Sequence, residues 1–310
     1  MNRNIALIAA ISAGIINGFP YYFVRMFMDG PTPDTIIYLG ARSMAAFLAM
    51  SAFILAGKFK VCYRNRPGLG LLILCTFLNP ILGQTLEVTA VSYASTSQTA
   101  VFISIIPLVV IIFSVLINHE APTRKQLLFL LLTVGGVLLV KLLGADHDSR
   151  GSLIGFILIL FTCLFIGLYR TLVRRLTAEF SSFEIVYLST VTGTICFNAY
   201  AMIRDRSVSV CFRYLADPGC VIAILFNGVI VFAFVFIIMT YASGHLPVAI
   251  AQSINLIYLP VTILVGVFLL DEPFTVVDVI GSALVLVGVI GSTLCYDPNN
   301  TSQNLYSGKK

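Results

Sequence analysis

Residues 90–117 read AVSYASTSQTAVFISIIPLVVIIFSVLI and carry no charged side chain. A helix rises about 1.5 Å per residue, so this run can cross the ~30 Å of hydrocarbon in a bilayer. A similar stretch, YASGHLPVAIAQSINLIYLPVTILVGVFLL, occupies residues 241–270. The chain therefore contains a membrane-spanning helix in two related copies.

The composition points to lipid as the main solvent of this surface. Of the 310 residues, 58% are hydrophobic and 11% charged, and the mean hydropathy is +0.98. Soluble domains carry about 25% charged residues. The net charge of +5 is typical of loops that face anionic lipid headgroups rather than of a nucleic-acid footprint. The seven cysteines show no metal-ligand spacing, and their odd number argues against a disulfide framework. We therefore expect no nucleic-acid partner, metal or cofactor.

Apolar stretches separated by polar, Gly or Pro residues predict an all-α membrane protein with ten transmembrane helices. Strands are disfavoured because these long runs do not alternate with period two. The expected spans are residues 5–24, 34–57, 69–91, 95–117, 125–143, 151–171, 182–203, 218–241, 247–270 and 276–296. The segment 297–310 is expected to be a polar cytoplasmic tail.

The positive charges in the loops predict the orientation. With ten spans, Lys and Arg on the side of the termini number twelve, against six on the other side, with Arg42 inside a span. We therefore expect a multi-pass protein of the cell membrane with both termini in the cytoplasm. The arginines at 204–213 run against this count. The first run is expected to be a retained helix rather than a cleaved signal segment.

The chain also matches itself. Matches between apolar residues are easy to obtain by chance, so those at Asn, Pro, Glu and Arg carry the weight. At an offset of 149, Arg25 meets Arg174 and Tyr38 meets Tyr187; at 148, Asn79 meets Asn227 and residues 93–95 meet 241–243; at 152, Glu120 meets Glu272; and at 153, Pro107 meets Pro260.

This repeat predicts two five-helix halves, residues 1–145 and 150–296. Since five is odd, the second half starts on the opposite face of the membrane, and the two repeats are inverted. Inverted repeats recur in secondary transporters, which bind substrate between the halves near the midplane.

Three groups of motifs recur in order along the chain. They are residues 90–100 with Pro107, Glu120 and Gly135-Gly136 in the first half; residues 241–243 with Pro260, residues 271–273, Gly281 and Gly288 in the second; and Arg42 with Ala45-Ala46. Together these motifs resemble the EamA family of the drug/metabolite transporter superfamily. The resemblance covers nearly the whole chain. It implies an inner-membrane carrier of small metabolites, often an exporter, with a cavity between the halves. Glu87 departs from the family pattern, because the resemblance implies an apolar or aromatic residue at this position.

Arg42 and Glu87 are the charged residues placed most clearly inside spans. An Arg or Asp at the centre of a membrane helix costs ~2.5–3.5 kcal/mol, so such residues are functional candidates. Both are expected in the outer half of the membrane on consecutive helices, where they could form an ion pair facing the cavity. Their repeat counterparts are Val191 and Val235, so this pair breaks the symmetry. The alternative is that Glu87 reaches the headgroups and Arg42 binds helix-end carbonyls.

Uncharged polar residues recur at helical spacing and therefore share helix faces that should point toward protein or a wet cavity. The alternative is interhelical hydrogen bonding, which is favoured for Asn79 and Asn227 because both halves share it. The candidate cavity residues, with the two charged ones, are Asn17, Tyr21, Arg42, Asn79, Glu87, Asn227, Gln252, Asn255 and Tyr258.

Other motifs favour structural roles. Glu120 and Glu272 precede helices and are expected to cap them rather than to carry protons. Pro20, Pro80, Pro107 and Pro260 lie within spans and can kink them. The glycines of spans five and ten favour close helix packing, in a core or in a homodimer.

The pattern as a whole predicts a secondary transporter that moves a small metabolite, an amino acid or a related solute, across the membrane by alternating access. Export is the favoured direction. No phosphate-binding loop and no His-Glu-x-x-His motif occurs in the sequence, so an ATP-driven pump and a metal hydrolase of that type do not fit. The expected protein is not an enzyme. The alternative is a membrane receptor or regulatory subunit on a transporter scaffold.

Overall fold

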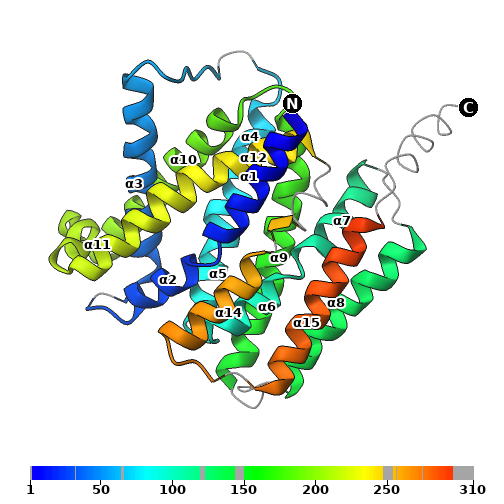
Figure 1. Ribbon diagram of the computed structural model, residues 1–310. Coiled ribbons are helices and arrows are strands. Elements are labelled where there is room, and N and C mark those ends of the chain that lie inside the picture. The colour runs from blue at the N-terminus through cyan, green and yellow to red at the C-terminus, as the bar shows by residue number, and fades with distance from the viewer. Residues whose placement is uncertain are drawn as a thin grey trace, which may run out of the picture.

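The computed structural model describes residues 2–31, 33–63, 66–118, 123–143, 150–246, 254–255, 257–273 and 275–295. These residues form helices joined by short connections, and none of them lies in a strand (Figure 1). The predicted tail 297–310, Glu120 and Gln252 fall outside the described residues. The first-half elements are α1 (Asn2–Ile16), α2 (Pro20–Met28), α3 (Thr35–Leu55), α4 (Leu69–Thr76), η1 (Phe77–Gly83), α5 (Gln84–Val91), α6 (Thr96–Ile103), α7 (Ile106–Asn118) and α8 (Arg124–Leu143).

The second predicted half, residues 150–296, contributes the remaining described elements, with α9 unbroken where the first span divides into α1 and α2. Its elements are α9 (Arg150–Leu176), α10 (Ser182–Asp205), η2 (Val208–Ala216), α11 (Pro218–Leu225), η3 (Phe226–Val235), α12 (Phe236–His245), α14 (Tyr258–Leu269) and α15 (Val276–Leu294). The element η2 is a 3₁₀-helix in the connection before α11.

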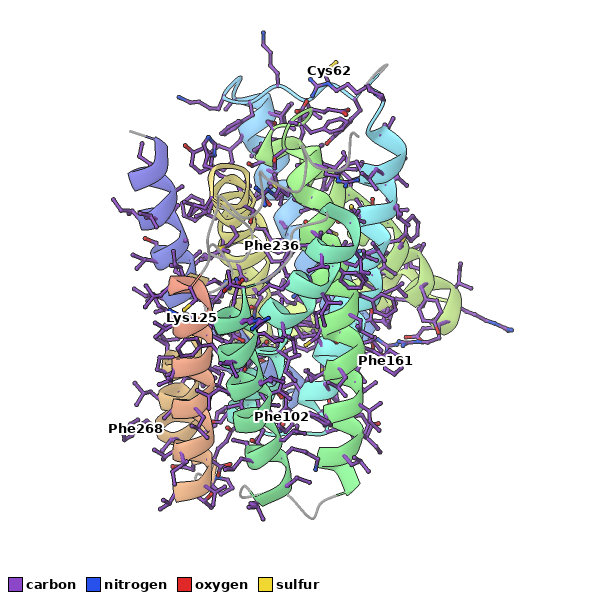
Figure 2. The ribbon with its side chains drawn as sticks, turned by 90° about the vertical axis from the view of Figure 1, so that its right-hand side faces the viewer. Cys62, Phe102, Lys125, Phe161, Phe236 and Phe268 are labelled. Atoms are coloured by element: carbon purple, nitrogen blue, oxygen red, sulfur yellow. The ribbon has the colours of Figure 1, made fainter. Side chains whose placement is uncertain are left out.

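Within the part of the chain that the structure describes, eight helical stretches are long and apolar enough to cross a membrane. Two shorter apolar helices, Tyr258–Leu269 and Val276–Ser292, follow them. Large apolar side chains cover the outer surface: Phe268 is 74% exposed and Phe161 is 51% exposed, whereas Phe102 is buried inside (Figure 2). Soluble monomers rarely expose apolar surface on this scale. The prediction of an all-helical membrane protein is thus confirmed for the described residues.

Helix starts follow from local capping residues. The Asp34 carboxylate accepts hydrogen bonds from the backbone N–H groups of Ile36 and Ile37 at 2.8 and 2.9 Å, which begins α3. Ser181 and Glu184 form a capping box at the start of α10. Each cap satisfies backbone donors that have no partner inside the helix.

Spans three and eight are both interrupted by π-helical segments, η1 and η3. Pro80 explains η1, because its ring lacks an N–H and cannot donate within the helix. These segments contain Asn79 and Asn227, which are repeat counterparts. Such π-helical insertions are frequent at functional sites. Span one is also interrupted, between Ile16 and Pro20.

Helices α8 and α15 pack along each other, as Figure 1 shows in green and red. Their contact depends on glycine: a Cβ at Gly136 would lie 2.6 Å from the Gly281 carbonyl oxygen. None of the described residues that line the central cavity belongs to α8 or α15. The expectation of close packing is confirmed for Gly136, Gly281, Gly288 and Gly291, and the contact lies within one chain. It is wrong for Gly135, where a Cβ would meet nothing within 4 Å. A homodimer stays a prediction.

On the side of the termini in the predicted topology, the connection after α3 is tied to the second half through Glu184. The Glu184 carboxylate accepts from the Cys62 N–H at 3.0 Å and pairs with the Arg66 guanidinium at 3.2 Å. The Tyr63 hydroxyl donates to the Glu184 carbonyl at 2.7 Å, and burial raises the pKa of Tyr63. This contact joins the two halves at one end of the molecule.

At the opposite end, Glu272 caps a helix other than the one predicted. Its carboxylate accepts from the backbone N–H groups of Thr96 and Ser97 at 2.6 and 2.9 Å, and from the Ser97 hydroxyl at 2.8 Å. These donors begin α6 of the first half, whereas the expectation was a cap on span ten. The cause is the connection after α14: Asp271 adopts a left-handed φ of 49° and the Glu272 N–H bonds back to Gly266.

Replacing Glu272 with Ala is therefore expected to lower the free energy of unfolding by about 1–2 kcal/mol, because it leaves the first donors of α6 without their acceptor. Equilibrium unfolding in detergent measures this change. Asp29→Ala removes an exposed carboxylate that follows α2 and pairs with Arg25 of that helix. It is the control and should change stability by less than about 0.5 kcal/mol. Equal effects of the two substitutions would contradict the capping role.

Candidate functional site: a central polar cavity

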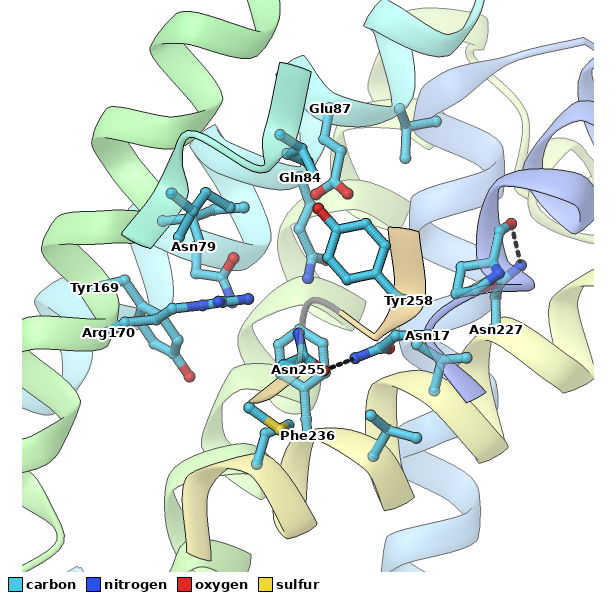
Figure 3. A pocket seen from close by; sticks show the side chains of 18 of the residues that line it. Asn17, Asn79, Gln84, Glu87, Tyr169, Arg170, Asn227, Phe236, Asn255 and Tyr258 are labelled. Atoms are coloured by element: carbon cyan, nitrogen blue, oxygen red, sulfur yellow. Dashed lines mark hydrogen bonds between the residues drawn. The ribbon is translucent and has the colours of Figure 1, made fainter. Parts of the chain in front are cut away.

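A cavity of about 150 Å³ lies where the interrupted spans meet (Figure 3). Eight of the nine predicted site residues line it, and the ninth, Gln252, lies outside the described residues. The lining residues are Asn17, Pro20, Tyr21, Val24, Arg42, Asn79, Gln84, Glu87, Val88, Val91, Ile103, Ile106, Ile166, Tyr169, Arg170, Val173, Asn227, Val231, Val235, Phe236, Met239, Thr240, Ser243, Asn255 and Tyr258. Their participation in substrate binding stays a prediction.

Asn17 and Asn255 join the two halves across the cavity. The Asn17 amide donates to the Asn255 side-chain oxygen at 2.9 Å, as the dashed line in Figure 3 shows. Asn17 can reach because the helix stops at Ile16. Gly18 follows in the interruption, and a Cβ there would overlap the side chain of Val261. Only a glycine allows the first span to approach α14 this closely.

Arg42 is held on α3 by the second half and by α5. Its guanidinium donates from Nη2 to the Gln84 side-chain oxygen and lies over the rings of Tyr38 and Phe232, at 5.5 and 5.1 Å from their centroids. Arg42 is only 7% exposed. A guanidinium is well suited to this site because it combines hydrogen bonding with stacking on aromatic rings.

The expected direct ion pair between Arg42 and Glu87 is not formed in the described part of the chain. Glu87 instead accepts a hydrogen bond from the Tyr21 hydroxyl at 2.8 Å. The reason is depth. Arg42 lies seven residues after Thr35, where α3 begins, and Gln84 lies seven before Val91, where α5 ends, so both are about 10 Å from those ends. Glu87 lies four residues before Val91, so it is about one helical turn closer to the end of α5 than Gln84 is, and does not reach the depth of Arg42.

Arg170 is a cavity residue that the sequence analysis missed. It was counted as a loop charge, but α9 continues to Leu176 and places Arg170 inside the helix. It points into the cavity in Figure 3. Ile166, Tyr169 and Val173, at helical spacing around it, line the cavity too. Without Arg170 the loop count becomes eleven against six, so the predicted orientation is unchanged.

The repeat contained a signal for Arg170. At an offset of 149, Tyr21 meets Arg170. Tyr21 was a candidate for the cavity, so its counterpart should have been one as well. Arg170 lies one residue before the end of the predicted sixth span, 151–171, and was counted with the loop charges for that reason. An amphipathic helix continues beyond its long apolar run when one face meets a polar cavity.

Asn79 and Asn227 lie on η1 and η3 and are 2% and 1% exposed. The Asn227 amide donates to the Pro20 carbonyl oxygen at 3.3 Å. The side-chain oxygens of both residues are buried and accept no hydrogen bond in the described structure. Asn227 thus has the interhelical contact favoured from sequence, and both residues also present an unused acceptor in the cavity region.

The cavity combines amides, phenols, two guanidinium groups and a carboxylate, and so can bind a small polar or charged solute. The described residues include no group of three His, Cys, Asp or Glu side chains placed to hold a metal ion.

Comparison with known proteins places this architecture among transporters. The EamA-like transporter family matches residues 4–142 and 153–294. The "Uncharacterized transporter YcxC" of Bacillus subtilis is 29% identical over 93% of both chains. An "Uncharacterized transporter" of Archaeoglobus fulgidus is 25% identical over 64% of this chain and 67% of its own length. A solved crystal structure superposes with a TM-score of 0.68 over 93% of this chain and 97% of its own; at 14% identity, this shows a shared fold alone.

Proposed function

Since this chain belongs to the EamA-like transporter family, we propose that it is a secondary transporter that exports a small metabolite by alternating access. The family and the names of its relatives indicate a membrane transporter rather than an enzyme. Such a protein contacts the lipid bilayer and a small-molecule substrate. An amino acid or a related solute is the proposed cargo, and the cavity residues predicted from sequence, together with Arg170, are its proposed binding site.

The observation that carries this proposal is that cavity residues occur in repeat-related pairs. At an offset of 149, four lining residues of the first span meet four of the sixth, and at 148 four of the third meet four of the eighth. The pairs are Asn17 and Ile166, Pro20 and Tyr169, Tyr21 and Arg170, Val24 and Val173, Asn79 and Asn227, Glu87 and Val235, Val88 and Phe236, and Val91 and Met239. A cavity on the axis between two repeats is the expected site of a carrier that rocks around its substrate.

The packing of helices supports the proposed inverted repeat of ten spans. In the first span, α1 packs on α12 of the eighth span. Its repeat counterpart α9, the sixth span, packs on η1 and α5 of the third span. The contact between the first and eighth spans is therefore repeated between the sixth and third. Three spans pack against their own repeat counterparts. The second packs against the seventh (α3 on α10), the fourth against the ninth (α6 on α14), and the fifth against the tenth (α8 on α15). We propose residues 1–145 and 150–296 as the two halves, with 297–310 as a cytoplasmic tail.

The protein is a multi-pass membrane protein, and we propose the plasma membrane as its location, with both termini in the cytoplasm. The arginines at 204–213 were the exception to the charge count. Arg204 is paired with Asp34 at 2.7 Å and with Asp205 at 2.8 Å. This pairing reduces its weight as a free positive charge in that loop.

Uptake into vesicles that contain the purified protein tests the function. Sealed vesicles are incubated with radiolabelled metabolites, with and without a pH gradient. We expect at least one solute to accumulate in protein-containing vesicles above protein-free vesicles. Saturable binding without accumulation under any gradient would instead establish the receptor alternative and overturn transport.

A further inference from the structure

The charges of the described residues around the cavity do not cancel. Of the described residues that line it, three are charged: Arg42 and Arg170 carry guanidinium groups, and Glu87 carries a carboxylate. In their ordinary ionised forms these groups sum to +1. A buried net charge is costly unless it is compensated, so a ligand of opposite charge is favoured there.

Unused hydrogen-bonding atoms at the cavity describe the ligand further. The Nε donor of Arg42 is buried and has no acceptor among the described residues. The side-chain oxygens of Asn79 and Asn227 are buried acceptors without a donor there. All three side chains are more than nine-tenths buried and line the cavity. Since unpaired buried polar atoms are unfavourable, a matching ligand offers both an acceptor and a donor.

The size of the cavity limits the ligand to a small metabolite. A water molecule, which has one non-hydrogen atom, needs roughly 15 Å³ of cavity volume. The cavity volume of about 150 Å³ therefore corresponds to a ligand of roughly ten non-hydrogen atoms. Arg170 from α9 and Glu87 from α5 extend into the same space in Figure 3.

We propose that this cavity selects small carboxylates of net charge −1 that also carry a hydroxyl or ammonium group, namely hydroxy acids or acidic amino acids. The proposal rests on the proposed transport function and specifies its substrate class. The ligand carboxylate binds Arg170 and Arg42, because a guanidinium matches a carboxylate in shape and charge. The hydroxyl or ammonium group donates to the free asparagine oxygens. A neutral amino acid brings no net negative charge to balance the +1 of the described lining residues.

Matched ligand pairs test the selectivity. Lactate is compared with lactamide, and glutamate with glutamine, by thermal stabilisation of the purified protein over a range of ligand concentrations. At least one acid should bind about tenfold or more tightly than its amide, because a hydrogen bond to a charged group contributes about 1.5–3 kcal/mol. Equal binding of acid and amide in both pairs, or no binding of either acid, would overturn the proposal.

Two charge variants make the test specific to the cavity. Arg170→Gln lowers the cavity charge to zero and should remove most of the preference for the acid. Glu87→Gln raises the cavity charge to +2 and should shift the preference from glutamate toward the dianion glutarate. Arg213→Gln, at an exposed position on η2, is the matched control and should keep the wild-type preference. If either folded cavity variant kept that preference unchanged, the cavity charges would not set selectivity.

Vesicle uptake separates this proposal from the function on which it rests. Selective binding of an acid without accumulation would keep the site and overturn transport. Accumulation of neutral solutes, with both acids excluded, would keep transport and overturn the substrate class.

Discussion

Replacing Gly136 with Leu is expected to destabilise the folded protein by about 3 kcal/mol or more. A Cβ at this position would lie 2.6 Å from the carbonyl oxygen of Gly281 and 3.0 Å from the backbone nitrogen of Val285. Backbone atoms cannot rotate away as a side chain can, so α15 would have to separate from α8. Inserting even small groups into packed cores costs about 1–3 kcal/mol, and a whole Leu side chain exceeds that.

The neighbouring glycine is a matched control. A Cβ at Gly135 would meet nothing within 4 Å, and this residue is on the exposed face of the same helix. Gly135→Leu should leave stability unchanged or raise it by up to about 1 kcal/mol, because glycine is a poor helix former. Equilibrium unfolding in detergent compares the two variants. Similar stability of both would show that α8 and α15 do not pack through Gly136.

The second large effect is expected at Arg42. Arg42→Gln should lower the rate of solute accumulation in vesicles by roughly 10- to 100-fold, which corresponds to losing one hydrogen bond made by a charged group. The substitution removes a cavity charge and the Nε donor, and it removes the cation that lies over Tyr38 and Phe232. Transport assays at several substrate concentrations measure the change.

Arg42→Lys distinguishes charge from geometry. Lysine keeps the positive charge but lacks the planar fork, so we expect its transport rate to lie between those of wild type and Arg42→Gln. The exposed Arg213→Gln should behave as wild type. Thermal melting in detergent checks that each variant is folded. Transport at the wild-type rate by folded Arg42→Gln would exclude Arg42 from the transport site.

Much of the fold could be read from short-range patterns. Each apolar run predicts a helix because hydrocarbon leaves no partner for backbone N–H and C=O groups outside the helix. The matches of Asn79 with Asn227 and of Pro107 with Pro260 predicted a doubled chain. The π-helical turns in η1 and η3 were not predicted, since Pro80 has no counterpart in η3 and hydropathy does not register the winding of a helix.

The sequence predicted which residues line the cavity better than it predicted the contacts that those residues make. Periodicity brought Asn17, Asn255 and Tyr258 to the cavity because residues on one helix face point the same way. Arg170 was missed because it lies next to the predicted end of its span, at residue 171, and was counted with the loop charges, although α9 continues to Leu176.

By itself, the sequence determined that this chain is helical in a membrane, that its helices come in two related sets, and that few charges lie within them. Hydropathy and helical spacing act over one or two turns and need no partner. Only the tertiary structure decided that Arg42 binds Gln84, that Glu87 binds Tyr21, and that Glu272 caps α6. Those contacts depend on the depth and rotation of each helix, which packing between distant parts of the chain sets.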